Sequence, residues 1–113
     1  MPYTVQRYQD KTGKAPYTDW IKKIRKKDIR AAGKIDVQVS RASAGNFGDH
    51  KFERGGVWAL RINYGPGYRV YYSVENGKII LLLVGGDKAS QQTDINNAID
   101  YLNDYHARIK DDQ

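Results

Sequence analysis

The sequence predicts an α+β fold in which helices lie on a small, mostly antiparallel sheet. Three consecutive strand patterns joined by tight turns cover residues 57–63, 68–74 and 78–84. Asn76-Gly77 separates the last two, and this dipeptide is typical of a type I′ hairpin turn, in which both central residues need positive φ. Apolar residues recur at helical spacing before and after these strands, which indicates helices on both sides of the meander in the sequence.

Before the meander, the chain predicts one strand and two helices. Residues 2–8 alternate like a strand, and a helix then begins near Thr18, which we expect to be its N-cap. Asp28 is expected to cap a second helix, in which Gly33 would permit close packing. That helix is predicted by apolar residues at helical spacing: Ile29, Ala32, Ile35, Val39 and Ala42. Residues 49–56 predict a polar loop that leads into the meander.

After the meander, Ser90 or Thr93 is expected to cap the last helix. Its apolar stripe is Ile95, Ile99, Leu102, His106 and Ile109, and residues 111–113 form a frayed tail. Residues 78–84, KIILLLV, lack polar alternation after the lysine and predict a central strand covered on both faces. The predicted order is therefore β-α-α-β-β-β-α, within one domain of residues 1–113.

Composition limits the class of protein. The chain has 113 residues, of which 40% are hydrophobic and 28% charged, as expected for a soluble globular protein. It contains no cysteine, which excludes disulfides and thiolate metal sites and fits a reducing cytosol. We see neither a signal-peptide pattern nor an apolar stretch long enough to span a membrane, so we expect a cytoplasmic protein.

The net charge of +6 is unevenly distributed. Residues 1–30 hold nine Lys or Arg against three Asp, whereas residues 89–113 hold two against five acidic residues. This balance suggests a polyanionic partner, and a basic face that only keeps the protein solvated is the alternative. The same alternatives apply to the basic run of residues 22–27, where the candidates for contact with RNA are Lys22, Lys23, Lys26 and Lys27.

Three cations are predicted to converge on the meander. Alternation places Arg69 and Tyr71 on the face opposite Tyr68 and Tyr72, which we expect in the core. By the same alternation Arg61 lies opposite its apolar neighbours, and Lys88 follows directly after the third strand. Because the planar guanidinium matches phosphate oxygens with paired hydrogen bonds, this cluster predicts a phosphate site.

The residues favour RNA cleavage without a metal over other chemistry. The two histidines, His50 and His106, have no metal-ligand spacing, and no nucleophile–histidine–acid motif is present. RNA carries its own nucleophile, the 2′-hydroxyl, and fixed cations stabilise the charge that develops on phosphorus. A lysine among arginines, Lys51 or Lys88, is a candidate proton carrier, as are His50, Glu53 and Tyr71.

The motifs resemble the RelE/HigB superfamily of type II toxins, and most closely its "addiction module killer protein" branch. The resemblance covers nearly the whole chain and is carried by Leu60-Arg61, Gly65-Pro66-Gly67-Tyr68-Arg69-Val70-Tyr71-Tyr72, Ile80-Leu81-Leu82, Gly85-Gly86-Asp87-Lys88, Gln91, Asp94-Ile95 and Ala98. It implies a bacterial endoribonuclease that enters the ribosomal A site and cuts mRNA during translation, inhibiting protein synthesis without a metal or other cofactor. It also implies a helix-turn-helix antitoxin, with operator DNA bound only through the toxin–antitoxin complex.

Residue by residue, the resemblance implies that Arg69 stabilises the transition state. Lys88 and Arg61 fall on basic positions of the family, and Lys51 and Arg54 lie where relatives carry further basic residues. Some relatives have a catalytic tyrosine early in the last helix, where this chain has Gln91, Thr93 and Asp94. The general acid and base therefore stay open, with Tyr71, His50 or a lysine as substitutes.

Two other functions stay open. ParE-type toxins of the same superfamily poison DNA gyrase without catalysis, and a non-catalytic nucleic-acid-binding module would use the basic helices for affinity. Arg61, Arg69 and Lys88 together favour the nuclease, because a gyrase poison has no need of that cluster. Codon preference, oligomeric state and the surface covered by the antitoxin do not follow from the residues.

Overall fold

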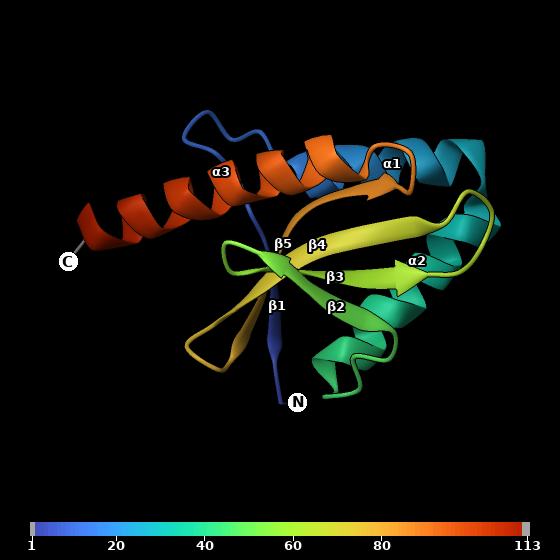
Figure 1. Cartoon of the computed structure of the whole chain (residues 1–113), viewed down its shortest axis with the longest axis horizontal. Helices are drawn as coiled ribbons and strands as arrows, with labels where there is room; N and C mark the ends of the chain where they lie inside the picture. Colours follow the sequence, from blue (N-terminus) through green and yellow to red (C-terminus); the bar gives the residue numbers. More distant parts are fainter. Residues whose placement is uncertain (1, 112–113) are drawn as a thin grey trace.

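The computed structural model describes residues 2–111, which form a five-stranded mixed sheet with helices on both faces (Figure 1). β1 lies parallel to β5, and the other neighbouring strands are antiparallel. This arrangement confirms the predicted α+β class. In spatial order the strands are β1 (Thr4–Arg7), β5 (Ile79–Asp87), β4 (Tyr68–Glu75), β3 (Val57–Ile62) and β2 (His50–Arg54).

The predicted meander is present as β3, β4 and β5. Asn76 and Gly77 have φ of 54° and 64°, as the type I′ turn between β4 and β5 requires. β5 lies between β1 and β4, and its residues 80–83 are buried, which confirms the strand covered on both faces. Tyr68 and Tyr72 lie in the core, also as predicted.

The prediction of a polar loop over residues 49–56 was wrong, because His50–Arg54 forms the edge strand β2. β2 pairs antiparallel with β3, and a bulge interrupts the pairing between Phe52 and Arg54. An edge strand with mainly exposed side chains carries no apolar alternation, so its sequence resembles that of a loop. The order is therefore β-α-α-β-β-β-β-α.

Helices α1 (Pro16–Lys27) and α2 (Ile29–Ser43) cover one face of the sheet. α1 begins at Pro16, so Thr18 is not its N-cap; proline suits the first helical position because its φ is preset. Asp28 caps α2 as predicted, since its Oδ1 accepts a hydrogen bond from the Ala31 amide at 3.1 Å. The expected close packing at Gly33 is absent, because a Cβ built there would meet no atom within 4 Å outside the helix's own backbone.

Helix α3 (Gln91–Asp111) covers the opposite face and extends beyond the sheet (Figure 1). Ser90 directly precedes it, so Thr93 lies inside the helix. Ile95 and Leu102 are buried as predicted, but the stripe ends there, because His106 and Ile109 are exposed. His106 Nε2 instead lies 2.6 Å from Glu75 Oε1 on β4. Of the expected tail, Asp111 is helical and residues 112–113 lie outside the described part of the chain.

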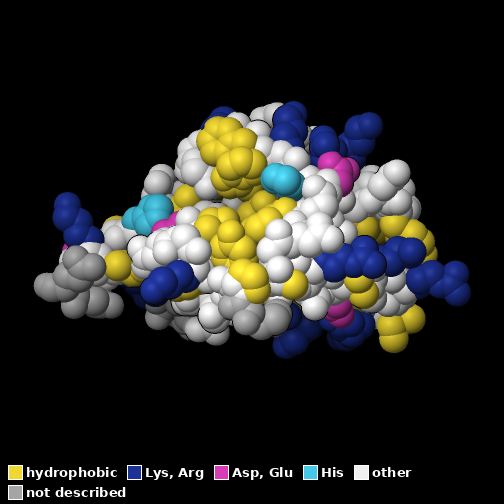
Figure 2. Space-filling view, turned by 90° about the horizontal axis from the view of Figure 1, so that it is seen from below, with side chains coloured by type: hydrophobic (Ala, Val, Ile, Leu, Met, Phe, Trp, Pro, Cys, Tyr) yellow, Lys and Arg dark blue, Asp and Glu magenta, His cyan; other side chains and the backbone are white. Residues whose placement is uncertain are grey.

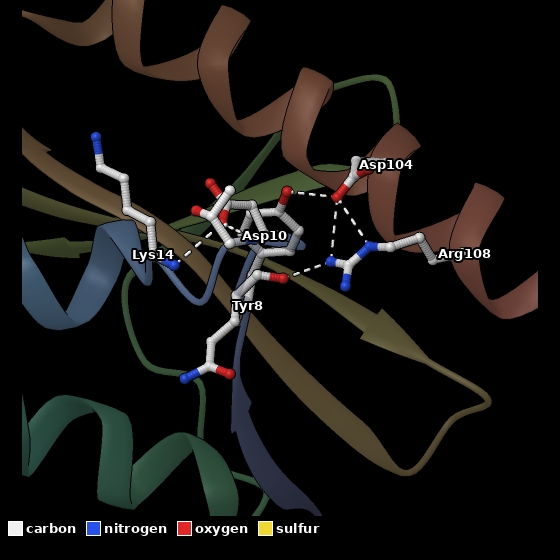
Figure 3. A network of polar contacts seen from close by, with 7 residues as sticks. Tyr8, Asp10, Lys14, Asp104 and Arg108 are labelled. Atoms are coloured by element: carbon white, nitrogen blue, oxygen red, sulfur yellow. Dashed lines mark hydrogen bonds and ion pairs between the residues drawn. The ribbon is translucent and has the colours of Figure 1, made fainter.

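A polar network joins the C-terminal half of α3 to the end of β1 (Figure 3). The Tyr8 hydroxyl donates to Asp104 Oδ2 at 2.6 Å, and Arg108 binds the same carboxylate at 3.1 Å and the carbonyl of Gln9. Burial, followed by the hydrogen bond to Asp104, raises the pKa of Tyr8 to about 12. The network therefore fixes the C-terminal half of α3 at the end of the sheet.

Within residues 2–111, no helix has the length and apolarity to cross a membrane.

Candidate functional site

The structure brings Arg61, Arg69 and Lys88 together in one cleft, which we call the cationic cleft. Arg61 and Arg69 lie opposite each other on β3 and β4, and Arg69 in turn pairs with Gly86 on β5, two residues before Lys88. The cleft has a volume of about 220 Å³, and its lining residues are Asp49, Arg61, Ile62, Asn63, Gly67, Tyr68, Arg69 and Lys88. The predicted convergence of the three cations is therefore present.

The turn between β3 and β4 holds Arg69 and Lys88 close to each other. Arg69 Nη1 donates to the Gly67 carbonyl at 3.2 Å. A Cβ built on Gly67, whose φ is +81°, would lie 3.7 Å from Lys88 Cβ and 3.8 Å from Arg69 Nη1. Arg69 on β4 and Lys88 after β5 thus both lie against Gly67, and the half-buried Arg69 forms part of the cleft wall.

Arg61 is the cation of the cleft whose charge is already compensated. Its Nε and Nη2 donate to Asp49 Oδ1 at 2.9 and 2.6 Å. Like charges placed opposite each other on neighbouring strands repel, and Asp49 offsets this repulsion between Arg61 and Arg69. Asp49 was not predicted as a site residue. Asp49 lies across from Arg61 because β2, which begins at the next residue, pairs with β3, and the sequence did not predict β2.

Two glycines let both helix layers approach β5 next to the cleft. A Cβ on Gly85 would lie 2.1 Å from Trp20 of α1, and one on Gly86 would lie 1.8 Å from Asp94 Oδ2 of α3. Asp94 also accepts a hydrogen bond from Ser90 Oγ at 2.5 Å, and burial is the main cause that raises its pKa. The Gly-Gly-Asp-Lys motif therefore positions the first turn of α3 directly beside Arg69.

Lys51 and Arg54 lie on β2 and are not among the residues that line the cleft. Lys51 pairs with Ala59, which places it on the α3 face, and its Nζ lies 4.0 Å from Glu53 Oε1. The Glu53 side chain is only 7% exposed and accepts a hydrogen bond from Gln91 Nε2 of α3 at 3.3 Å. Arg54 is bound to Asn96 of the same helix.

Tyr71 lies on the face of Arg69 but inside the core under α3. It is fully buried, and its hydroxyl has no hydrogen-bond partner within residues 2–111. Burial is the main cause that raises its pKa, and the positive charge of Arg69 opposes it. In this arrangement the hydroxyl has no access to a ligand in the cleft, and a catalytic role of Tyr71 stays a prediction.

His50 lies on the other face of the sheet, in an aromatic hollow. Its Nδ1 is 2.8 Å from the Gly48 carbonyl, and its ring centroid is 5.8 Å from that of Phe47 and 5.7 Å from that of Trp58. The hollow has a volume of about 160 Å³ and is lined by Tyr3, Phe47, His50, Trp58, Tyr72 and Val74. Figure 2 shows hydrophobic side chains gathered in the middle of this side of the molecule, with histidine at the margin. The structure thus separates His50 from the cationic cleft.

The lysines of the basic run are exposed on α1, and none is among the residues that line the cleft: Lys22, Lys23, Lys26 and Lys27. Sequence reasoning missed three cations on α2 instead. Arg30, Lys34 and Arg41 line a groove of about 790 Å³ that adjoins the cleft. Their spacing of four and seven residues is the signal that places them on one helix face.

Metal-ligating side chains do not gather in the described part of the chain. Among residues 2–111, no three His, Cys, Asp or Glu side chains form a group that could hold a metal ion. Apart from Asp49, which is paired with Arg61, the charged groups that line the cleft are the positive hydrogen-bond donors of Arg61, Arg69 and Lys88, which suit phosphate oxygens.

Comparison with known proteins identifies the family. The model of the phage-derived protein Gp49-like family (DUF891) matches residues 18–100, which include all residues of the cleft. An uncharacterized protein of Haemophilus influenzae (strain Rd) is 44% identical over 82 residues, covering 73% of this chain and 81% of that protein. No solved structure matches the chain significantly. The chain therefore belongs to the phage-derived Gp49-like family, which is associated with toxin–antitoxin systems.

Proposed function

We propose that the chain is the toxin of a type II toxin–antitoxin system and cleaves mRNA in the ribosomal A site. The observation that carries this proposal is the convergence of Arg61, Arg69 and Lys88 in one open cleft. The association of the family with toxin–antitoxin systems supports the biological role. The proposed partners are a helix-turn-helix antitoxin and the translating ribosome, and the proposed place of action is the cytoplasm.

The proposed reaction is a transesterification within the message. The 2′-oxygen attacks the adjacent phosphorus and gives its proton to a base. The P–O5′ bond breaks and the 5′-oxygen takes up a proton, which leaves a 2′,3′-cyclic phosphate and a 5′-hydroxyl. Two negatively charged oxygens develop on phosphorus in the transition state, and fixed cations aimed at them lower the barrier.

Arg69 and Lys88 are the side chains to which we assign this stabilisation. Arg69 is held by the Gly67 carbonyl, so part of its orientation is fixed before substrate binds. Lys88 is exposed and carries three donors on a flexible stem, which suits the leaving 5′-oxygen. Arg61 joins them when phosphate replaces Asp49 at its guanidinium.

The candidate bases are Lys51 and Glu53 on β2, which lie beside each other but do not line the cleft, with Lys51 on the same α3 face of the sheet as Arg61 and Arg69. The ribosome would hold the message in a reactive geometry, and effective molarities of about 10⁵ M or more allow a weak base to suffice. A loss of cleavage in Glu53→Gln with a changed pH–rate profile would assign Glu53, whereas the same result in Lys51→Ala would assign the lysine.

Primer extension on a reporter message after brief induction tests the function. Matched reporters with and without a start codon separate translated from untranslated RNA. We expect cuts only in the translated reporter and only within its reading frame. An intact message in growth-arrested cells would overturn the nuclease, and a gyrase supercoiling assay would then test the ParE-like alternative.

A further inference from the structure

The α2 groove is a cationic surface that extends the cationic cleft. It lies between α2 and the end of β3, and α2 contributes Arg30, Lys34 and Arg41 to its wall. These positions span eleven residues of α2, or about 16 Å at the helical rise. A stacked single strand advances about 3.4 Å per nucleotide, so the groove accommodates roughly five nucleotides.

The charges of the groove are free to bind an anion. Within residues 2–111, Arg30, Lys34 and Arg41 form no ion pair with a carboxylate. Lys34 lies 5.2 Å above the ring of Tyr64, at the β3 side of the groove. The acid of α2, Asp36, is instead bound to Arg25 of α1 at 3.0 Å. The lining of the α2 groove therefore carries three cations without a carboxylate partner, beside the Arg61–Asp49 pair.

The groove and the cleft share one wall. Asp49, Arg61, Ile62 and Asn63 line both, so the two hollows meet at Arg61. A chain whose phosphate lies between Arg61 and Arg69, on the α3 face, can reach α2 around the end of β3, where Ile62 and Asn63 line both hollows. Gly33 faces the groove with no side chain, which leaves open space beside Lys34.

We propose that the α2 groove binds the sugar–phosphate backbone of the same single-stranded RNA whose scissile phosphate lies in the cationic cleft. Arg30, Lys34 and Arg41 each contact a phosphate on one side of the cut. This inference rests on the proposed function, because it uses the cleft as the place of cleavage. RNA fits better than an acidic helix, since the wall offers a row of cations and few exposed apolar anchors. Of its apolar residues, Ile62 is buried and the Tyr64 ring lies under Lys34, which leaves mainly Val37.

The test measures RNA affinity of the whole chain as a function of salt. The probes are uncleavable 2′-O-methyl oligonucleotides of two and ten nucleotides, and fluorescence anisotropy gives Kd between 50 and 200 mM salt. The variant Arg30→Ala/Lys34→Ala/Arg41→Ala removes three exposed charges from the groove. Its matched control, Lys22→Ala/Lys23→Ala/Lys26→Ala, removes three exposed charges from α1.

We expect the groove variant to weaken binding of the ten-nucleotide probe by about tenfold or more at low salt. The slope of log K against log salt should fall by about 2, because each phosphate contact on a single strand contributes roughly 0.7. The two-nucleotide probe, which is too short to extend from the cleft along the groove, should change little. Equal losses in the groove variant and the α1 control would overturn the proposal, since overall charge would then explain both.

The outcomes separate this inference from the proposed function. If the wild type cleaves the message but the groove variant binds RNA with wild-type affinity and salt dependence, RNA binding by the groove is rejected and the nuclease stands. An uncut message in arrested cells would reject the nuclease, whatever the groove variant does. A groove variant that loses binding of a polyglutamate decapeptide as strongly as binding of RNA would also reject the assignment, because it would indicate an acidic protein partner.

Discussion

Two basic regions of the molecule differ in how the fold arranges their positive charges. On α1, Lys22, Lys23, Lys26 and Lys27 follow one another closely in sequence, and all four extend from an exposed helix edge into solvent. In the cationic cleft, Arg61, Arg69 and Lys88 are far apart in sequence, but β3, β4 and the end of β5 bring them to one wall.

Convergence of cations on one hollow defines a candidate site better than charge density along the chain. Exposed charges on a convex surface are screened within about 8 Å at physiological salt. Charges that surround one hollow act together on a single bound phosphate, and their orientation is fixed by the strands.

The largest expected effect is that of Arg69→Ala in the cleft. We expect cleavage on programmed ribosomes to fall roughly 100- to 1,000-fold, because one preorganised donor is lost from the transition state. The matched control is Lys78→Ala, an exposed cation at the other end of β5, which should cleave like the wild type. Equal cleavage by Arg69→Ala and the wild type, with an unchanged melting temperature, would remove Arg69 from the site.

The next largest expected effect is on stability, and it comes from the buried hydroxyl of Tyr71. Tyr71→Phe removes an unsatisfied polar group, so we expect the free energy of unfolding to rise by on the order of 1 kcal/mol and cleavage to stay unchanged. Burial raises the pKa of Tyr71, so the tyrosine ionises more readily in the unfolded chain. Wild-type stability therefore falls as pH rises above about 10, and the gap to Tyr71→Phe widens there.

Urea unfolding between pH 7 and pH 11 measures this gap. The other tyrosines with raised pKa are common to both proteins, so the difference isolates Tyr71. A Tyr71→Phe variant that folds normally but no longer cleaves would instead assign the hydroxyl to proton transfer, which requires α3 to open at its first turn.

The features that were predicted correctly depend on residues close together in the sequence, and those that were missed depend on contacts between distant residues. The meander, the Asn-Gly turn and the position of Arg69 opposite the core tyrosines depend on alternation and local turn chemistry, which a sequence displays directly. β2 was missed because an exposed edge strand needs no apolar pattern, and Asp49 was missed with it. Gly85 and Gly86 could not be interpreted, because their contacts come from α1 and α3, which are distant in the chain.

A smaller effect is expected where the cleft already contains an acid. Asp49→Asn removes the negative charge that occupies the guanidinium of Arg61, so we expect single-stranded RNA to bind several-fold more tightly at 50 mM salt. The gain should shrink as salt rises. Asp100→Asn, at an exposed position of α3, is the control with the same charge change. Equal gains in both variants would mean that Asp49 acts only through net charge.

The smallest effect is expected on α1. Replacement of Lys22, Lys23, Lys26 and Lys27 by glutamine removes four charges from an exposed helix edge that lines neither the cleft nor the groove. We expect cleavage on ribosomes to change by less than about twofold at 150 mM salt, and by more at 20 mM, where the Debye length exceeds 20 Å. A large loss that persists at 150 mM would indicate direct contacts between α1 and RNA. The basic run would then be a second binding surface, and the contrast between it and the cleft would no longer hold.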